Sequence, residues 1–178
     1  LDTYFWRFSK DAKWEINDDG LLIVSENGDS GIYRQDKLLG KGSFGSVYLY
    51  REVNTGHQIA LKVNNDQDFD RNKIEAAKES IVAEANTMRN LDHPNIVKYL
   101  GFFEQNDHCY MMLEYESGGD LENRLGFKNI PTYDARFDPM DTNQIVKIFW
   151  QVLLALNHLH QKSIIHNDLK PSAIMFDG

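Results

Sequence analysis

The stretch that decides the fold is residues 40–47, which read Gly-Lys-Gly-Ser-Phe-Gly-Ser-Val. In dinucleotide-binding folds such a glycine loop opens a helix, and an acidic residue about 20 positions later binds a ribose. Here residues 47–50 are strand-like and residues 54–56 (Asn-Thr-Gly) form a turn, so the loop is followed by a hairpin and not by a helix. This excludes a dinucleotide-binding loop in which Asp66 would be the ribose-binding acid. A glycine loop between antiparallel strands suits a flap that covers phosphates, and taken alone a plain hairpin turn fits equally well.

The pattern on either side of this loop predicts strands first and helices afterwards. Residues 32–39, 46–51, 58–63, 99–104 and 108–115 are rich in β-branched and aromatic residues, and turn residues separate them. Apolar residues recur every three or four positions over 74–88 and again over 142–160, which predicts two helices. Asp141 is expected to cap the second helix, with Gln144 as its return partner. This order of elements indicates an α+β fold.

A lysine and a glutamate in this region predict an ion pair. Lys62 lies within the otherwise apolar strand 60–63, where a surface lysine is the simpler interpretation if the strand is considered alone. Glu84 shares the inward helix face with Ile81 and Met88, and a carboxylate on a buried face needs a cation. We therefore expect Glu84 to hold Lys62 where the lysine can meet a polyphosphate.

Two further segments have patterns that could contribute to a binding or catalytic site. Residues 111–121 form an apolar strand that runs into Gly118-Gly119, where free backbone groups suit a flat heterocycle, although alone this is only a strand end. Residues 166–175 read His-Asn-Asp-Leu-Lys-Pro-Ser-Ala-Ile-Met and follow the second helix directly.

From Gly40 to Met175 these segments, together with residues 91–97 (Leu-Asp-His-Pro-Asn-Ile-Val), resemble a eukaryotic protein kinase domain in order and spacing. Asp168-Leu-Lys-Pro is similar to the serine/threonine branch. The resemblance covers roughly residues 32–178. It implies a five-stranded antiparallel β N-lobe with a regulatory helix over 32–116. The first part of an incomplete helical C-lobe follows over 117–178, and residues 1–31 form an aromatic-rich extension or hairpin.

The resemblance implies an ATP site. Glycine backbone covers the phosphates, apolar side chains sandwich the adenine, Leu113 takes the gatekeeper position, backbone at 114 and 116 binds adenine, and Asp120 reaches toward the ribose. The residues of this site are Leu39, Gly40, Gly42, Gly45, Val47, Ala60, Lys62, Leu113, Glu114, Glu116 and Asp120.

The resemblance also implies the catalytic roles. Lys62 grips the α- and β-phosphates and Glu84 orients it, while Asp168 accepts the proton of the substrate hydroxyl and Lys170 steadies the γ-phosphate. The partners implied are ATP and either a protein substrate or a scaffold partner.

Three features depart from the family pattern. Ala173 replaces a Mg²⁺-ligating asparagine, so the Mg²⁺ site is incomplete and no metal ligand is assigned. Asn167 replaces an arginine that pairs with a phosphorylated loop in many relatives. The chain ends at Phe176-Asp177-Gly178, before the family's Asp-Phe-Gly ligand. We expect a serine/threonine kinase in the full-length protein, with residues 1–178 alone inactive; the alternative is a nucleotide-binding pseudokinase that acts as a scaffold or allosteric partner.

Composition and charge narrow the class of protein. The 178 residues are 42% hydrophobic and 26% charged, which excludes collagen-like and disordered classes. A net charge of −8 disfavours nucleic acid and anionic membranes as partners. The single cysteine, Cys109, reads as a core residue and indicates a reducing compartment. We expect a cytoplasmic protein without a membrane span, with the nucleus left open.

Other candidate sites fail. The acidic residues Asp66, Asp68 and Asp70 mimic the start of a calcium loop, but Arg71 stands where that loop needs glycine. The histidines at 158 and 160 point to different helix faces and form no metal pair.

The two ends of the chain carry separate expectations. Near the start, aromatic residues and the Asp19-Gly20 turn predict a hairpin packed on the main domain, with a disordered leader as the alternative; these aromatics are Tyr4, Phe5, Trp6, Phe8 and Trp14. Near the end, the helix over 142–160 has an apolar stripe too wide for the β lobe to cover. We therefore expect residues 1–178 not to form a stable monomer unless a further segment or a partner covers Ile145, Phe149, Val152 and Leu156.

Overall fold

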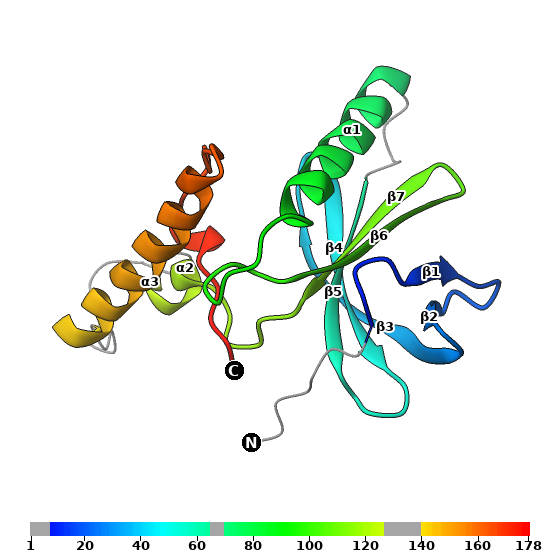
Figure 1. Cartoon of the computed structure of the whole chain (residues 1–178), viewed down its shortest axis with the longest axis horizontal. Helices are drawn as coiled ribbons and strands as arrows, with labels where there is room; N and C mark the ends of the chain where they lie inside the picture. The colour runs from blue at the N-terminus through cyan, green and yellow to red at the C-terminus, as the bar shows by residue number, and fades with distance from the viewer. Residues whose placement is uncertain (1–7, 65–69, 127–139) are drawn as a thin grey trace. The chain divides into compact units, whose positions relative to one another are not determined.

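The computed structural model describes residues 8–64, 70–126 and 140–178 (Figure 1). The predicted aromatics at positions 4–6 and the acidic residues Asp66 and Asp68 lie outside these ranges. The chain divides into two compact units. Unit 1 comprises Leu1–Leu91 and Lys98–Tyr115, and unit 2 comprises Asp92–Val97 and Glu116–Gly178.

Unit 1 contains one antiparallel sheet of seven strands in the order β1-β2-β3-β4-β5-β7-β6 (Figure 1). The strands are β1 (Lys13–Ile16), β2 (Leu22–Glu26), β3 (Asp29–Lys41), β4 (Gly45–Glu52), β5 (Gln58–Asn64), β6 (Tyr99–Gln105) and β7 (His108–Glu114). The last five strands are those predicted for the β lobe. The predicted count of five is too low, because the N-terminal hairpin adds β1 and β2 to the same sheet.

The turn between β2 and β3 explains why the hairpin joins the sheet. Asn27 and Gly28 both have positive φ (52° and 86°), and Glu26 pairs with Asp29 across them. Two left-handed residues in a two-residue loop match the twist of antiparallel strands, and Asn-Gly is a preferred sequence for such a turn. β2 therefore pairs with the first part of β3.

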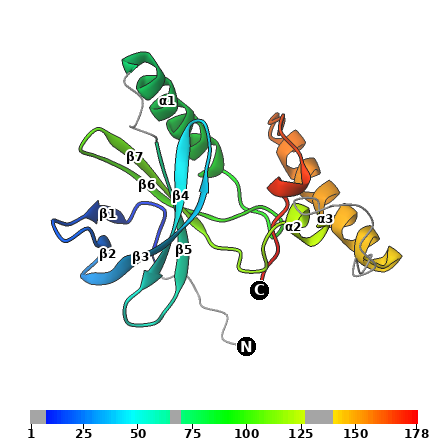
Figure 2. The same ribbon diagram turned by 180° about the vertical axis from the view of Figure 1, so that it is seen from behind.

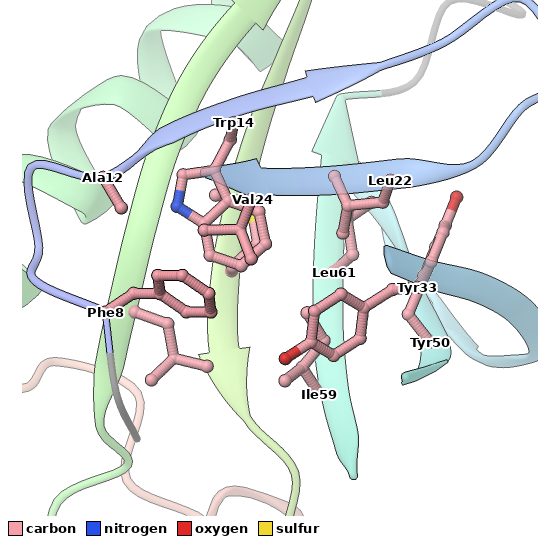
Figure 3. Close-up of a cluster of buried hydrophobic side chains, with 11 residues drawn as sticks. Phe8, Ala12, Trp14, Leu22, Val24, Tyr33, Tyr50, Ile59 and Leu61 are labelled. Carbon is pink, nitrogen blue, oxygen red and sulfur yellow. The ribbon is translucent and has the colours of Figure 1, made fainter. Parts of the chain in front are cut away.

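One face of the sheet is covered by the N-terminal segment. Trp14, Leu22 and Val24 are buried against Ile59 and Leu61 of β5, as Figure 3 shows. Phe8 is also buried in this cluster. The N-terminal hairpin thus packs its aromatics on the main domain, as predicted for Phe8 and Trp14.

The first and last strands in the sheet order also meet. The side chain of Gln105, at the end of β6, accepts a hydrogen bond from the Ile16 N–H (2.9 Å) and donates one to the Ile16 carbonyl (2.7 Å). Beside this contact Trp14 lies over Gly101. A Cβ at Gly101 would fall 2.4 Å from Trp14 Nε1, so only glycine leaves room for the indole in this arrangement.

Helix α1 (Arg71–Met88) covers the opposite face of the sheet (Figures 1 and 2). Asp70 caps its N-terminus by accepting a hydrogen bond from the Asn72 N–H. Ile81 and Ala85 of the helix pack on Cys109 and Met111 of β7. Cys109 is buried, as predicted.

Unit 2 contains α2 (Leu121–Arg124), α3 (Thr142–Gln161) and the 3₁₀ helix η2 (Pro171–Ala173). The predicted capping box forms: Asp141 accepts from the Gln144 N–H, and the Gln144 side chain accepts from the Asp141 N–H. Within α3, all of which is described, Leu159 alone is buried. Among the described residues, no helix is both long and apolar enough to cross a membrane.

Candidate functional site

The glycine loop is the tip of the β3–β4 hairpin. Gly40 pairs with Val47, and the Gly42 N–H donates to the Gly45 carbonyl (2.8 Å). A Cβ at Gly45 would lie 2.5 Å from the carbonyl oxygen of Val63, so close packing of β4 on β5 requires this glycine. A Cβ at Gly40 would meet no described atom within 4 Å, and one at Gly42 would make only an ordinary contact. Packing inside the chain therefore explains Gly45 but not the other two glycines.

Lys62 lies on the sheet face that α1 covers. It pairs with Val47 of β4 and Met111 of β7, and its ammonium forms an ion pair with the Glu84 carboxylate. The predicted pair is therefore present. The expectation of a buried carboxylate needs correction, because the Glu84 side chain is 39% exposed and that of Lys62 is 25% exposed. Glu84 lies at the margin of the helix–sheet contact, so the pair remains open to solvent on one side.

Apolar residues predicted for the adenine lie next to Lys62 on the same face. Ala60 is buried and pairs with Leu49 and Leu113 in the neighbouring strands. Side chains opposite each other in antiparallel strands share a face, so Ala60 and Leu113 form a continuous apolar row beside Val47. Leu39 lies at a register shift between Leu38 and Gly40, where a bulge re-aims a side chain, and it is 36% exposed.

Glu114, the last residue of β7, is bonded to the rest of the chain through both its backbone and its side chain. The Glu114 N–H donates to the Lys98 carbonyl (3.0 Å), and the Glu114 carboxylate accepts from the Lys98 N–H (2.6 Å). The N–H of Glu114 is therefore committed to the protein. Glu116, the other predicted adenine residue here, is half-buried and belongs to unit 2.

Asp120 has a structural role in this conformation. It caps α2, with Oδ1 accepting from the Asn123 N–H (2.7 Å) and Oδ2 accepting from the Asn123 side chain (2.6 Å). A ribose hydroxyl would have to share this carboxylate with the cap.

Asp168 and Lys170 form a second ion pair, in unit 2. Lys170 Nζ lies 2.7 Å from Asp168 Oδ2. The hydrogen bond from Lys170, then its positive charge, lowers the pKa of Asp168 below the ordinary value. The Asp168 side chain is 74% exposed. The preceding Asn167 has φ of 60°, a left-handed conformation that asparagine adopts more readily than most residues.

Position 173 offers no ligand to a magnesium ion. Ala173 is exposed in η2, and its methyl group has no donor atom. In residues 8–64, 70–126 and 140–178, no group of three or more His, Cys, Asp or Glu side chains is arranged to hold a metal ion.

Comparison with known proteins identifies the family. The sequence model described as "Protein kinase domain" matches residues 33–178. The chain belongs to the eukaryotic protein kinase family. It is 35% identical over 145 residues to calcium-dependent protein kinase 4 of Plasmodium falciparum, covering 82% of this chain and 25% of that protein.

Two further relatives are also similar over most of this chain but over only a small part of their own length. CBL-interacting protein kinase 21 of Oryza sativa subsp. japonica is 33% identical over 150 residues (83% of this chain and 26% of the relative). A MAP kinase kinase kinase of Schizosaccharomyces pombe is 34% identical over 162 residues (87% and 13%). The chain therefore spans about a quarter or less of the length of these curated relatives.

The structure contains contacts that the sequence does not predict. Lys10 and Asp11 both bind Arg89, at the C-terminal end of α1. No local pattern predicts an interaction over such a separation. The Asn27-Gly28 turn, by contrast, is a recognisable hairpin signal and would have revealed the β2–β3 pairing.

Proposed function

We propose that this chain is the nucleotide-binding part of a protein serine/threonine kinase, which transfers the γ-phosphoryl group of ATP to a hydroxyl of a protein. The observation that carries this proposal is the ion pair between Lys62 and Glu84. A lysine in an otherwise apolar strand, held in place by a helix carboxylate and open to solvent on one side, is suited to bind a polyphosphate. Protein kinases use such a lysine on the α- and β-phosphates.

The glycine loop supports the same proposal. Gly40 and Gly42 have no steric neighbours that demand glycine, and neither has positive φ. A requirement for close approach of a ligand to the backbone would account for both. In the proposed complex their backbone covers the phosphates, while Leu39, Val47, Ala60 and Leu113 contact the adenine. Glu114 contributes its carbonyl, since its N–H is already bonded.

The proposed transfer step uses residues of unit 2. The substrate hydroxyl oxygen bonds to the γ-phosphorus, the bond from that phosphorus to the β–γ bridging oxygen breaks, and ADP leaves. Asp168 accepts the hydroxyl proton, since its carboxylate is ionised at neutral pH like that of an ordinary aspartate, and Lys170 lowers its pKa further. Lys170 lies next to this carboxylate, where its charge is available to the γ-phosphate. The sequence Asp168-Leu-Lys-Pro supports a serine or threonine acceptor.

Titration of an ATP analogue into the chain, followed by calorimetry, tests this proposal. Lys62→Met is expected to weaken binding at least about tenfold, because a charge-assisted contact to phosphate is worth roughly 1.5–3 kcal/mol. Lys13→Met is the matched control. It removes an exposed lysine of β1 that pairs with Glu15 and should leave the affinity unchanged. Equal affinities in all three proteins, or no binding to any of them, would overturn the proposal.

A second function, that of a nucleotide-binding pseudokinase acting as a scaffold, is favoured by Ala173. Its methyl group offers no metal ligand where the protein kinase pattern has asparagine, so less of the charge on a transferring phosphate would be neutralised. A phosphate-transfer assay on the longest natural protein that contains this chain separates the two functions. Turnover that disappears in Asp168→Asn supports the kinase, whereas nucleotide binding without Asp168-dependent turnover supports the pseudokinase.

A further inference from the structure

The N-terminal segment Phe8–Ile16 contacts both the sheet and the end of the helix that carries Glu84. On the sheet side, Trp14 is buried over Gly101 of β6, and Ile16 exchanges two hydrogen bonds with the Gln105 side chain. Phe8 and Ala12 are buried in the same cluster. These contacts fix the segment at both of its ends.

On the helix side, the contacts converge on Arg89, which directly follows α1. The Asp11 carboxylate forms an ion pair with the Arg89 guanidinium, and Lys10 Nζ donates to the Arg89 carbonyl (2.9 Å). The guanidinium also interacts with the buried Tyr99 of β6, where it opposes the effect of burial that raises the pKa of the phenol. Arg89 therefore links α1, the N-terminal segment and the sheet.

The partial negative charge at the C-terminal end of α1 is expected to be stabilised by the cations in these contacts. The last turn of α1, which lies wholly within the described residues, carries no basic side chain. The unbonded carbonyls at a helix C-terminus carry partial negative charge and favour a nearby cation. Arg89, the C-cap, and Lys10, which donates to the Arg89 carbonyl, both bring positive charge to this end of the helix.

We propose that the N-terminal segment Phe8–Ile16 is a positioning element for α1, and that through Arg89 it holds Glu84 against Lys62. Glu84 lies five residues before Arg89, about 7.5 Å along the helix axis. A helix transmits a displacement of its end over such a distance, and Glu84 is only at the margin of the packed face. Ile81 and Ala85 hold the middle of α1 on the sheet, and the contacts of Arg89 hold its end, so both set the position from which Glu84 reaches Lys62. Lys10, Asp11 and Arg89 are positioning residues, since none of them belongs to the proposed nucleotide site.

Amide hydrogen exchange on residues 1–178 tests the positioning itself and needs no nucleotide. In the double variant Lys10→Met/Asp11→Asn, the amides of residues 82–88 should exchange about three- to tenfold faster, while those of β4 and β5 keep their rates. The matched control Lys13→Met/Glu15→Gln removes another exposed ion pair of the same segment (3.3 Å) and should change neither set. Unchanged exchange in α1, or a uniform increase throughout unit 1, would overturn the inference.

A second measurement tests whether the N-terminal segment affects nucleotide affinity by way of Glu84. This measurement rests on the proposed function. The double variant should weaken binding of an ATP analogue about two- to fivefold in the otherwise unchanged chain, and should have no further effect when Glu84→Gln is already present. An equal loss in both backgrounds would show that the segment does not act through Glu84. If no protein binds the analogue, the proposed function fails, while the exchange experiment still decides whether the segment positions α1.

Discussion

Unit 1 buries both faces of its sheet, whereas helix α3 of unit 2 leaves most of its apolar side chains exposed. In unit 1 the N-terminal segment covers one face and α1 covers the other. In α3 the exposed apolar residues include Val146, Phe149, Trp150 and Leu153. Both regions have regular apolar periodicity. Such a pattern therefore predicts a helix or strand, but it does not tell whether other residues of this chain bury the apolar face of that helix or strand.

Replacing one tryptophan in each unit is expected to give the largest difference in the free energy of unfolding. Trp14 is 4% exposed in unit 1 and Trp150 is 63% exposed in unit 2. We expect Trp14→Ala to lower the free energy of unfolding by about 3–5 kcal/mol, because it leaves a large cavity in the core. Trp150→Ala should change it by less than about 0.5 kcal/mol. Guanidinium unfolding of both variants measures the difference, and similar losses would mean that the two units are equally well packed.

Two glycines of the β3–β4 hairpin allow the role of close packing in unit 1 to be separated from the proposed role in nucleotide binding. Gly45→Ala should cost about 1–3 kcal/mol of stability, since its Cβ would meet the Val63 carbonyl of the adjacent strand. Gly40→Ala should leave stability unchanged or slightly higher, because its Cβ would point into open space. In nucleotide titrations, however, we expect Gly40→Ala to weaken binding. Equal melting temperatures for the two variants would contradict the role assigned to Gly45.

The exposed face of α3 should make residues 1–178 associate with themselves. Large exposed apolar patches are sites of association or aggregation. Phe149→Lys/Leu153→Lys is expected to increase the monomer fraction in analytical ultracentrifugation without lowering the melting temperature of unit 1. The matched substitution Gln151→Lys/Asn157→Lys, at exposed polar positions of the same helix, should change nothing. A wild-type chain that is monomeric and melts in one cooperative transition would contradict this expectation.

The smallest expected effect concerns Asp168 in unit 2. Lys170 lowers the pKa of this exposed carboxyl, so the carboxylate stays ionised to a lower pH than an isolated aspartate. Lys170→Met should move the pKa of Asp168 upward toward its ordinary value, with no measurable change in unfolding. A carboxyl titration by NMR, with Lys162→Met as control, checks this shift. An unchanged titration in Lys170→Met would show that the pair does not persist in solution.

Much of this fold follows from local sequence. The strands, the helices and the Asp141–Gln144 capping box follow from patterns within short stretches of sequence. The Lys62–Glu84 pair joins a strand to the helix that follows it in the chain, so it can also be predicted. The sequence also predicts the β1–β2 hairpin but not its place in the sheet, because Trp14 packs on Gly101, which belongs to a strand far away in the sequence.

The limits of sequence reasoning are clearest at the candidate site. The exposure of Glu84 depends on how far α1 lies over the sheet, which no local pattern specifies. The contacts of Lys10 and Asp11 with Arg89 join segments nearly eighty residues apart. The cap that Asp120 makes on α2 competes with the ribose role expected from the resemblance, and only coordinates reveal that competition.

The most direct test of the account is a double-mutant cycle on Lys62 and Glu84, read by the affinity for an ATP analogue. If Glu84 acts by holding Lys62, then Glu84→Gln should weaken binding in the wild-type chain and have almost no effect when Lys62→Met is present. We expect this strong coupling, together with unchanged affinity in the control Lys13→Met. Losses that add independently would contradict the claim that the ion pair forms the nucleotide site.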